Sequence, residues 1–206
     1  YLEVVSRSSN RLLRLVDDLL FVARLQSGRL ELTPSRLELN EIAQQSAEEA
    51  RGRADAKDLE LVVNANGPVP VDGDRGRIFQ LLDNLISNAI KFTPDGGRVE
   101  INVAAERIAR LEVCDTGIGF SEREAARVFE RFYRPRTSQS QGSGLGLAIV
   151  RRIVELGNGS VAIEDGLAHA EGRGCAIVIR LPALDSAPEP IEPDDAPPGM
   201  ADTPSH

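Results

Sequence analysis

Apolar residues recur at every third or fourth position along residues 75–92, which predicts an amphipathic helix with one buried face. The apolar positions are Ile78, Leu81, Leu82, Leu85, Ile86, Ala89 and Ile90. A polar stripe runs beside them and consists of Gln80, Asn84, Asn88 and Lys91. Asparagine is a poor helix former, because its short amide competes with the backbone for hydrogen bonds. The stripe therefore indicates a role other than helix stability.

The same spacing predicts further helices at residues 1–28, 40–54, 122–131 and 145–156. Asn40 and Asp74 are the expected N-caps of the helices that follow them, and Gly157 is an expected C-terminal stop. Apolar runs predict strands at residues 59–65, near Val69, and within 98–115, 159–164 and 174–182. Because helices and strands do not alternate strictly, we expect an α+β fold, a two-layer sandwich whose mixed sheet carries helices on one face.

The chain divides into three regions by composition. The helix at residues 1–28 presents an apolar seam that a lone helix cannot bury, so we expect a partner helix before Tyr1 or in a second chain. Residues 1–30 are thus expected to be a truncated bundle segment with its linker, and 36–183 a folded domain. Residues 184–206 are acidic and proline-rich, which predicts a disordered tail.

Charge and cysteine content narrow the function classes. The formal net charge is -8, and six acidic residues lie from Asp185 onward, so residues 1–184 are nearly neutral. This balance argues against generic binding to nucleic acid or to an anionic membrane. No apolar run is long enough to span a bilayer. Cys114 and Cys175 lie in apolar strand-like runs, so we expect buried hydrophobes in a reducing compartment and not a disulfide.

Two glycine-rich segments are candidates for a phosphate-binding site. "DTGIGF" (115–120) follows a predicted strand, and "GSGLGLAIV" (142–150) opens a predicted helix, where backbone amides and the helix dipole favour anions. The second segment is not a dinucleotide fingerprint, because Leu147 stands where the third glycine is needed. A Walker-type loop is excluded too, because neither of the two lysines, Lys57 and Lys91, follows a glycine.

Four motifs in order carry a family resemblance: "NLISNAIKF", "DTGIGF", "FERFYR" and "GSGLGLAIV". Their order and spacing resemble the ATP-binding domain of bacterial sensor histidine kinases, a branch of the Bergerat-type ATPases, over residues 37–181. The helix at 1–28 and "ARLQSGRLEL" resemble the second helix and linker of the family's dimerisation domain. The resemblance implies the Bergerat fold, ATP and Mg²⁺ as cofactors, and an ATP-dependent protein-histidine kinase.

The resemblance also implies a role for each site residue. Asn88 would coordinate Mg²⁺, Asn84 would contact phosphate or metal-bound water, and Lys91 would neutralise phosphate. Asp115 would accept a hydrogen bond from the adenine amine. Arg134 would reach the γ-phosphate, so that Asn84, Lys91 and Arg134 form the expected catalytic set. The other expected ATP contacts are Phe92, Gly117, Gly119, Gly142, Ser143, Gly144, Leu145 and Gly146.

Asn84 distinguishes phosphoryl transfer from hydrolysis. Related gyrases and mismatch-repair ATPases carry glutamate at the corresponding position, where the carboxylate activates water, whereas an amide cannot take a proton. We therefore expect transfer of the γ-phosphoryl group to a histidine. Neither His169, expected in a loop, nor His206 resembles the acceptor motif, so the acceptor helix would lie before Tyr1 and this chain alone would not phosphorylate itself.

Partners and alternatives follow from the same resemblance. It implies a response regulator, an acceptor helix of the same or a partner subunit, a homodimer in the full-length protein, and no nucleic acid. The location would be the cytoplasm, as the intracellular part of a membrane-anchored sensor. The alternatives are an anti-sigma-factor type serine kinase of the same fold, and a non-catalytic nucleotide-sensing or dimerisation module.

Overall fold

The computed structural model describes residues 33–105, 107–134, 143–169 and 172–184, together with the separate positions Val16, Leu20 and Ala23. These three positions are helical, as the apolar seam predicts. The remainder of the predicted first helix, the tail from residue 185 and the candidate Gly142 lie outside the described residues. The expected division into three regions therefore stays a prediction.

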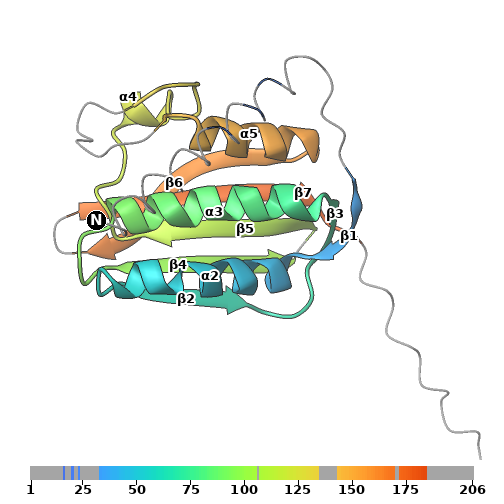
Figure 1. Ribbon diagram of the computed structural model, residues 1–206, viewed down its shortest axis with the longest axis horizontal. Helices are drawn as coiled ribbons and strands as arrows, with labels where there is room; N and C mark the ends of the chain where they lie inside the picture. Colours follow the sequence, from blue (N-terminus) through green and yellow to red (C-terminus); the bar gives the residue numbers. More distant parts are fainter. Residues whose placement is uncertain are drawn as a thin grey trace, which may run out of the picture.

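A five-stranded sheet forms one layer of the molecule (Figure 1). Its strands lie in the order β2, β4, β5, β7, β6. β2 runs parallel to β4, whereas the other neighbouring strands are antiparallel. The mixed sheet that the sequence predicts is confirmed. The strand bounds are β2 Glu60–Ala65, β4 Arg98–Ala105, β5 Ile108–Asp115, β6 Ser160–His169 and β7 Gly172–Pro182.

Three helices cover one face of this sheet: α2 (Leu39–Asp55), α3 (Arg75–Phe92) and α5 (Gly146–Leu156). Figure 1 shows α3 running along the middle of the layer, between α2 and α5. Alternate residues of the central strands face these helices and are buried, as period-two patterning requires. They join the apolar stripe of α3 in one hydrophobic cluster that includes Val99, Ile101, Leu111, Val113, Leu81, Leu85 and Ile86. The two-layer α+β architecture is thus confirmed.

A small second sheet, formed by the strand predicted near Val69 and by one strand that the sequence analysis missed, closes the end of the domain where α3 begins. β1 (Ser35–Glu38) pairs antiparallel with β3 (Pro70–Gly73). The pairing also changes the start of α2. The Leu39 backbone N–H donates to the Val69 carbonyl at 3.0 Å, and Glu38 occupies the N-cap position without a side-chain capping bond. The prediction that Asn40 caps this helix is therefore wrong, because Glu38 is at the N-cap position and the Val69 carbonyl, just before β3, accepts the first helical N–H.

Asp74 is the N-cap of α3, as predicted. Its Oδ1 accepts the Arg77 backbone N–H at 3.1 Å, and its Oδ2 accepts the Thr33 backbone N–H at 3.0 Å. Partial burial raises the pKa of Asp74, but these hydrogen bonds, the Gly76 N–H and the charge of Arg77 together outweigh burial and hold the pKa below its ordinary value. One carboxylate therefore joins the segment before β1 to the first turn of α3.

Two other predictions need correction. The helix expected at residues 122–131 is only one turn long, α4 (Glu122–Ala125), capped by a reciprocal Ser121–Glu124 capping box. Beyond it the chain continues in turns, because the Arg127 N–H donates to the Glu124 carbonyl and the Glu130 N–H to the Arg127 carbonyl. His169, expected in a loop, is the last residue of β6.

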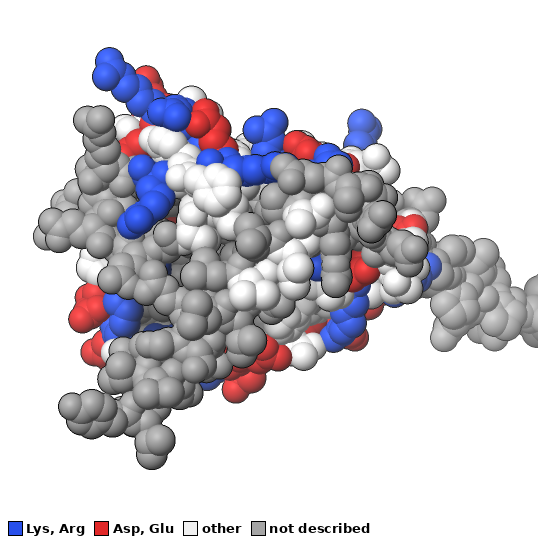
Figure 2. Space-filling view, turned by 45° about the horizontal axis from the view of Figure 1, so that its top comes forward, with Lys and Arg blue, Asp and Glu red and all other residues white. Residues whose placement is uncertain are grey.

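The cysteine prediction is confirmed, since Cys114 and Cys175 are both buried and free. Within the described residues, no helix combines the length and apolarity needed to cross a membrane. Figure 2 shows basic and acidic side chains interspersed around an uncharged area of the visible face. The described part of that face thus lacks the single-sign patch typical of nucleic-acid binding.

Candidate nucleotide site

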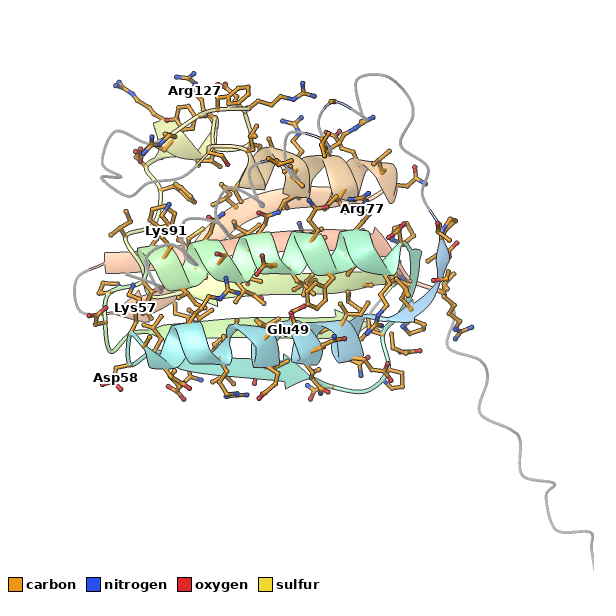
Figure 3. The ribbon with its side chains drawn as sticks, in the orientation of Figure 1. Glu49, Lys57, Asp58, Arg77, Lys91 and Arg127 are labelled. Carbon is orange, nitrogen blue, oxygen red and sulfur yellow. The ribbon has the colours of Figure 1, made fainter. Side chains whose placement is uncertain are left out.

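The polar stripe of α3 lies on the helix face that the hydrophobic core leaves open. Asn84, Asn88 and Lys91 are spaced by four and three residues, which puts their side chains on one face of a helix. All three are partly exposed, whereas Leu81, Leu85 and the other apolar positions are buried. Figure 3 shows Lys91 at the opposite end of α3 from Arg77. Lys91 Nζ lies 4.8 Å from the Phe92 ring centroid, a cation–π contact.

Asp115 ends β5 and is a buried carboxylate, 7% exposed. Its Oδ1 accepts the Gly117 backbone N–H at 2.8 Å and the Cys175 backbone N–H, from β7, at 3.2 Å. These two donors compensate the loss of hydration and fix the rotation of the carboxylate. The sequence therefore places an oriented acceptor at the end of a central strand.

The first glycine loop packs directly on the end of α3. A Cβ at Gly117 would lie 2.7 Å from the Phe92 carbonyl oxygen, so only glycine lets the two backbones approach this closely. Gly119 has a positive φ of 64°, which glycine adopts without strain. The Asp115 loop and the backbone of Phe92 are thus held together in one junction.

The second glycine loop meets the middle of α3. A Cβ at Gly146, the first residue of α5, would lie 3.0 Å from Asn84 Oδ1. Gly144 has a φ of 71°, and its carbonyl accepts the Phe132 N–H at 2.8 Å. The Ser143 hydroxyl accepts the Leu145 N–H at 3.2 Å, and Leu145 is buried. The loop therefore brings the start of α5 against the asparagine stripe.

Most of the predicted residues meet around α3, from Asp115 and Gly117 at one end to Gly144 and Gly146 near its middle. Arg134 is exposed at the last described position before residue 143. The expected role of Arg134 at the γ-phosphate stays a prediction. The individual roles of the other residues stay predictions as well.

The geometry fits a nucleotide with a divalent cation. The glycines let both loops pack closely against the residues around α3, and the amides of Asn84 and Asn88 supply neutral oxygen ligands. Among the described residues, no group of three or more His, Cys, Asp or Glu side chains could hold a metal ion. A magnesium ion here would therefore depend on amide oxygens, water and bound phosphate, a combination that Mg²⁺ accepts.

Sequence reasoning missed residues that pack against the site residues without being part of the predicted motifs. Gly174 of β7 lies so close to Asp115 that a Cβ would be 1.6 Å from its carbonyl oxygen. Thr93 is 1% exposed, and its hydroxyl donates to the Ala89 carbonyl at 2.7 Å. A glycine inside an apolar strand signals close backbone approach, so Gly174 could have been found from the sequence. The environment of Thr93 has no such local signal.

Comparisons with known proteins identify the class to which this site belongs. The model of the histidine kinase-, DNA gyrase B- and HSP90-like ATPase family matches residues 73–185. The chain belongs to this family. The match begins just before α3 and ends just after β7, so it includes the α3 stripe and both glycine loops.

Particular relatives are sensor kinases. Sensor protein kinase PmrB of Pseudomonas aeruginosa is 39% identical over 180 residues, which are 86% of this chain and 37% of PmrB. Sensor histidine kinase RppB of Synechocystis is 36% identical over 186 residues, 88% of this chain and 40% of RppB. The chain thus spans about two fifths of these relatives. The resemblance to the catalytic ATP-binding domain of histidine kinases is confirmed.

Solved structures agree with this assignment. The mycobacterial sensor histidine kinase MprB superposes with a TM-score of 0.66 at 33% identity, covering 73% of this chain and 98% of that structure. Full-length ShkA, solved in complex with AMPPNP, superposes with a TM-score of 0.76 at 33% identity, covering 91% of this chain and 39% of ShkA. The predicted Bergerat-type fold is therefore confirmed.

Proposed function

We propose that this chain is the ATP-binding catalytic portion of a sensor histidine kinase. It binds Mg-ATP beside α3 and delivers the γ-phosphoryl group to a histidine on an acceptor helix. The observation that carries the proposal is the junction of Asp115, the two glycine loops and the asparagine stripe within a domain of the matched family. The complex of ShkA with AMPPNP supports nucleotide as the ligand.

Different site residues bind the adenine, the phosphates and the magnesium ion. Asp115, oriented by the N–H groups of Gly117 and Cys175, accepts a hydrogen bond from the adenine amine. Gly144 and Gly146 let the backbone at the start of α5 approach the phosphates, where the helix dipole favours negative charge. Asn88 holds Mg²⁺ through its amide oxygen, and Lys91 and Arg134 neutralise phosphate charge.

Magnesium, when bound, supplies charge neutralisation and orients the phosphates for in-line transfer. Asn84 cannot serve as a general base, because a neutral amide has no basic site at ordinary pH. This feature favours transfer to a protein side chain over activation of water.

The partners and location follow as parts of the same proposal. The acceptor is a histidine of a dimerisation helix, since neither His169 nor His206 matches the acceptor motif. The phosphoryl group then passes to an aspartate of a response regulator. We expect the domain to act in the cytoplasm, in a homodimeric full-length protein. The serine-kinase and non-catalytic alternatives gain no support, because the relatives reported above are named sensor kinases.

The binding experiment is isothermal titration calorimetry of AMPPNP, with and without Mg²⁺, on the wild-type chain and two variants. Asn88→Ala should lose the magnesium-dependent part of the affinity. Asn64→Ala is the matched control, because Asn64 is on β2 and bonds Asn102, away from α3. Equal binding by wild type and Asn88→Ala in Mg²⁺ would refute the assigned metal ligand, and absence of wild-type binding would refute the function.

The transfer experiment uses labelled ATP and a separately prepared acceptor domain from a related sensor kinase. The expected product is an acid-labile phosphohistidine on the acceptor, with little free phosphate. Rapid release of phosphate without any phosphoprotein would show that the domain is a hydrolase, and the proposal would fail.

A further inference from the structure

Lys57, which is not among the predicted site residues, holds the end of α3 from the side away from the stripe. Its Nζ donates to the Ile90 carbonyl at 2.9 Å and also to the Thr93 carbonyl. The Asp95 carboxylate lies 3.9 Å away. The last carbonyls of a helix have no partner within the helix and carry the negative end of its dipole, so a cation with several donors stabilises them. Figure 3 shows Lys57 and Lys91 at the same end of α3.

Backbone hydrogen bonds near Lys57 also join the turn after α2 to the turn after α3. The Gly96 N–H donates to the Lys57 carbonyl at 3.1 Å, and the Glu60 N–H donates to the Gly97 carbonyl at 2.9 Å. The turn at residues 56–59, after α2, and the turn at residues 93–97, after α3, are therefore joined by backbone and side chain. We call these two segments the turn pair.

The turn pair contacts the nucleotide site at the first glycine loop. A Cβ at Gly97 would lie 2.7 Å from the Thr116 hydroxyl oxygen, and that hydroxyl accepts the Arg98 N–H at 3.0 Å. Thr116 stands between Asp115 and Gly117. On the other side, the Phe92 carbonyl is the group that approaches Gly117. A shift of the turn after α3 would thus displace both Phe92 and the backbone that orients Asp115.

We propose that Lys57 is a positioning residue of the nucleotide site, which fixes the last turn of α3 and the Asp115 loop in one arrangement before the nucleotide binds. This inference rests on the proposed function. Lys57 does not touch the nucleotide; it acts through the carbonyls of Ile90 and Thr93. The chain contains two lysines, and both serve this helix end, Lys91 on the ligand side and Lys57 behind it.

The test compares three variants by calorimetry with ATP and GTP in Mg²⁺ and by thermal melting. Lys57→Met keeps the alkyl stem and removes the charge and donors. We expect it to weaken ATP binding about tenfold, since charge-assisted hydrogen bonds that set the site are lost. We also expect it to reduce the preference for ATP over GTP, since the Asp115 loop is no longer fixed. Lys57→Arg, which can still donate to both carbonyls, should recover most of the affinity and of the preference.

Arg53→Met is the matched control. Arg53 also joins α2 to α3, through Asp83 at 2.9 Å and Ser87 at 3.3 Å, but earlier along the helix. It should lower the melting temperature without changing the ATP preference. The proposal is overturned if Lys57→Met binds ATP like wild type, or if Arg53→Met loses affinity and preference equally. If Lys57→Met does not fold, Lys57→Gln, which keeps one donor pair, is judged by the same criteria. Loss of binding in the wild type itself would instead refute the proposed function.

Discussion

The contact between Gly174 and Asp115 gives the most quantitative prediction. A Cβ at Gly174 would lie 1.6 Å from the Asp115 carbonyl oxygen and 2.5 Å from its carbon. Restoring an ordinary contact of about 3.4 Å requires β7 and the end of β5 to separate by about 1.8 Å. The Cys175 N–H, now 3.2 Å from Asp115 Oδ1, would then leave hydrogen-bonding range.

Gly174→Ala should therefore cost affinity as well as stability. Losing a hydrogen bond to a buried carboxylate costs about 1.5–3 kcal/mol, and overpacking adds about 1–3 kcal/mol of destabilisation. If the free energy of the lost hydrogen bond is lost from nucleotide binding, the Kd for Mg-ATP rises about tenfold to hundredfold. Calorimetry and urea unfolding measure the two effects separately.

Gly52→Ala is the matched control for this prediction. Gly52 lies in α2, and a Cβ there meets nothing within 4 Å. Alanine is favoured over glycine in a helix by about 0.8–1 kcal/mol, so this variant should gain stability and keep its affinity. The reasoning is refuted if Gly174→Ala binds and unfolds like the wild type, because the strands would then have absorbed the methyl group without moving Asp115.

Two further predictions concern titration. Asp74→Asn keeps an oxygen for the Arg77 N–H but loses the acceptor for Thr33. Because the folded pKa of Asp74 is lowered, its contribution is complete above about pH 3.9 and is lost as the pH falls through the folded value. Urea unfolding should thus show a wild-type advantage that narrows below about pH 4, and a constant difference would contradict the assignment. Burial raises the pKa of Cys114 to about 12 and that of Cys175 further, so both thiols should react with a disulfide reagent at pH 8 far more slowly in the native than in the unfolded chain. Mass spectrometry of the labelled peptides checks this, and fast native labelling would contradict the burial.

Helix α3 shows how much the sequence alone could predict. Its apolar stripe, Asp74 cap and polar stripe depend on spacing within one segment, and all three match the structure. The small strand β1 was missed, because "SRLE" has no strand pattern of its own and is stabilised by pairing with β3 about 35 residues later. The predicted length of α4 was wrong, because the backbone after Ala125 forms turns, such as that closed by the Arg127 N–H and the Glu124 carbonyl, which the local sequence does not distinguish from a helix.

The candidate site likewise contains residues that the sequence could predict and contacts that it could not. Motif residues such as Asn88 and Asp115 could be found from spacing, because each lies in a recognisable local pattern. The supporting contacts of Lys57 and Cys175 could not be found this way, because Lys57 contacts Ile90 across 33 positions, and Cys175 contacts Asp115 across 60. Such support depends on which strands and turns become neighbours, and only the folded chain fixes this.

The pairing of β1 with β3 has a consequence for how the domain is joined to other modules. The Leu184 N–H donates to the Pro70 carbonyl at 2.9 Å, and Ala183 bridges Val71, so the end of β7 adds to the same corner. The chain therefore enters the domain at β1 and leaves it after β7 at neighbouring points on one side. A folded unit whose two chain ends lie close together at the surface can be inserted between flanking segments without disturbing its core. In the described residues, both ends of the fold thus lie at one corner, beside the small sheet and away from the Asp115 loop.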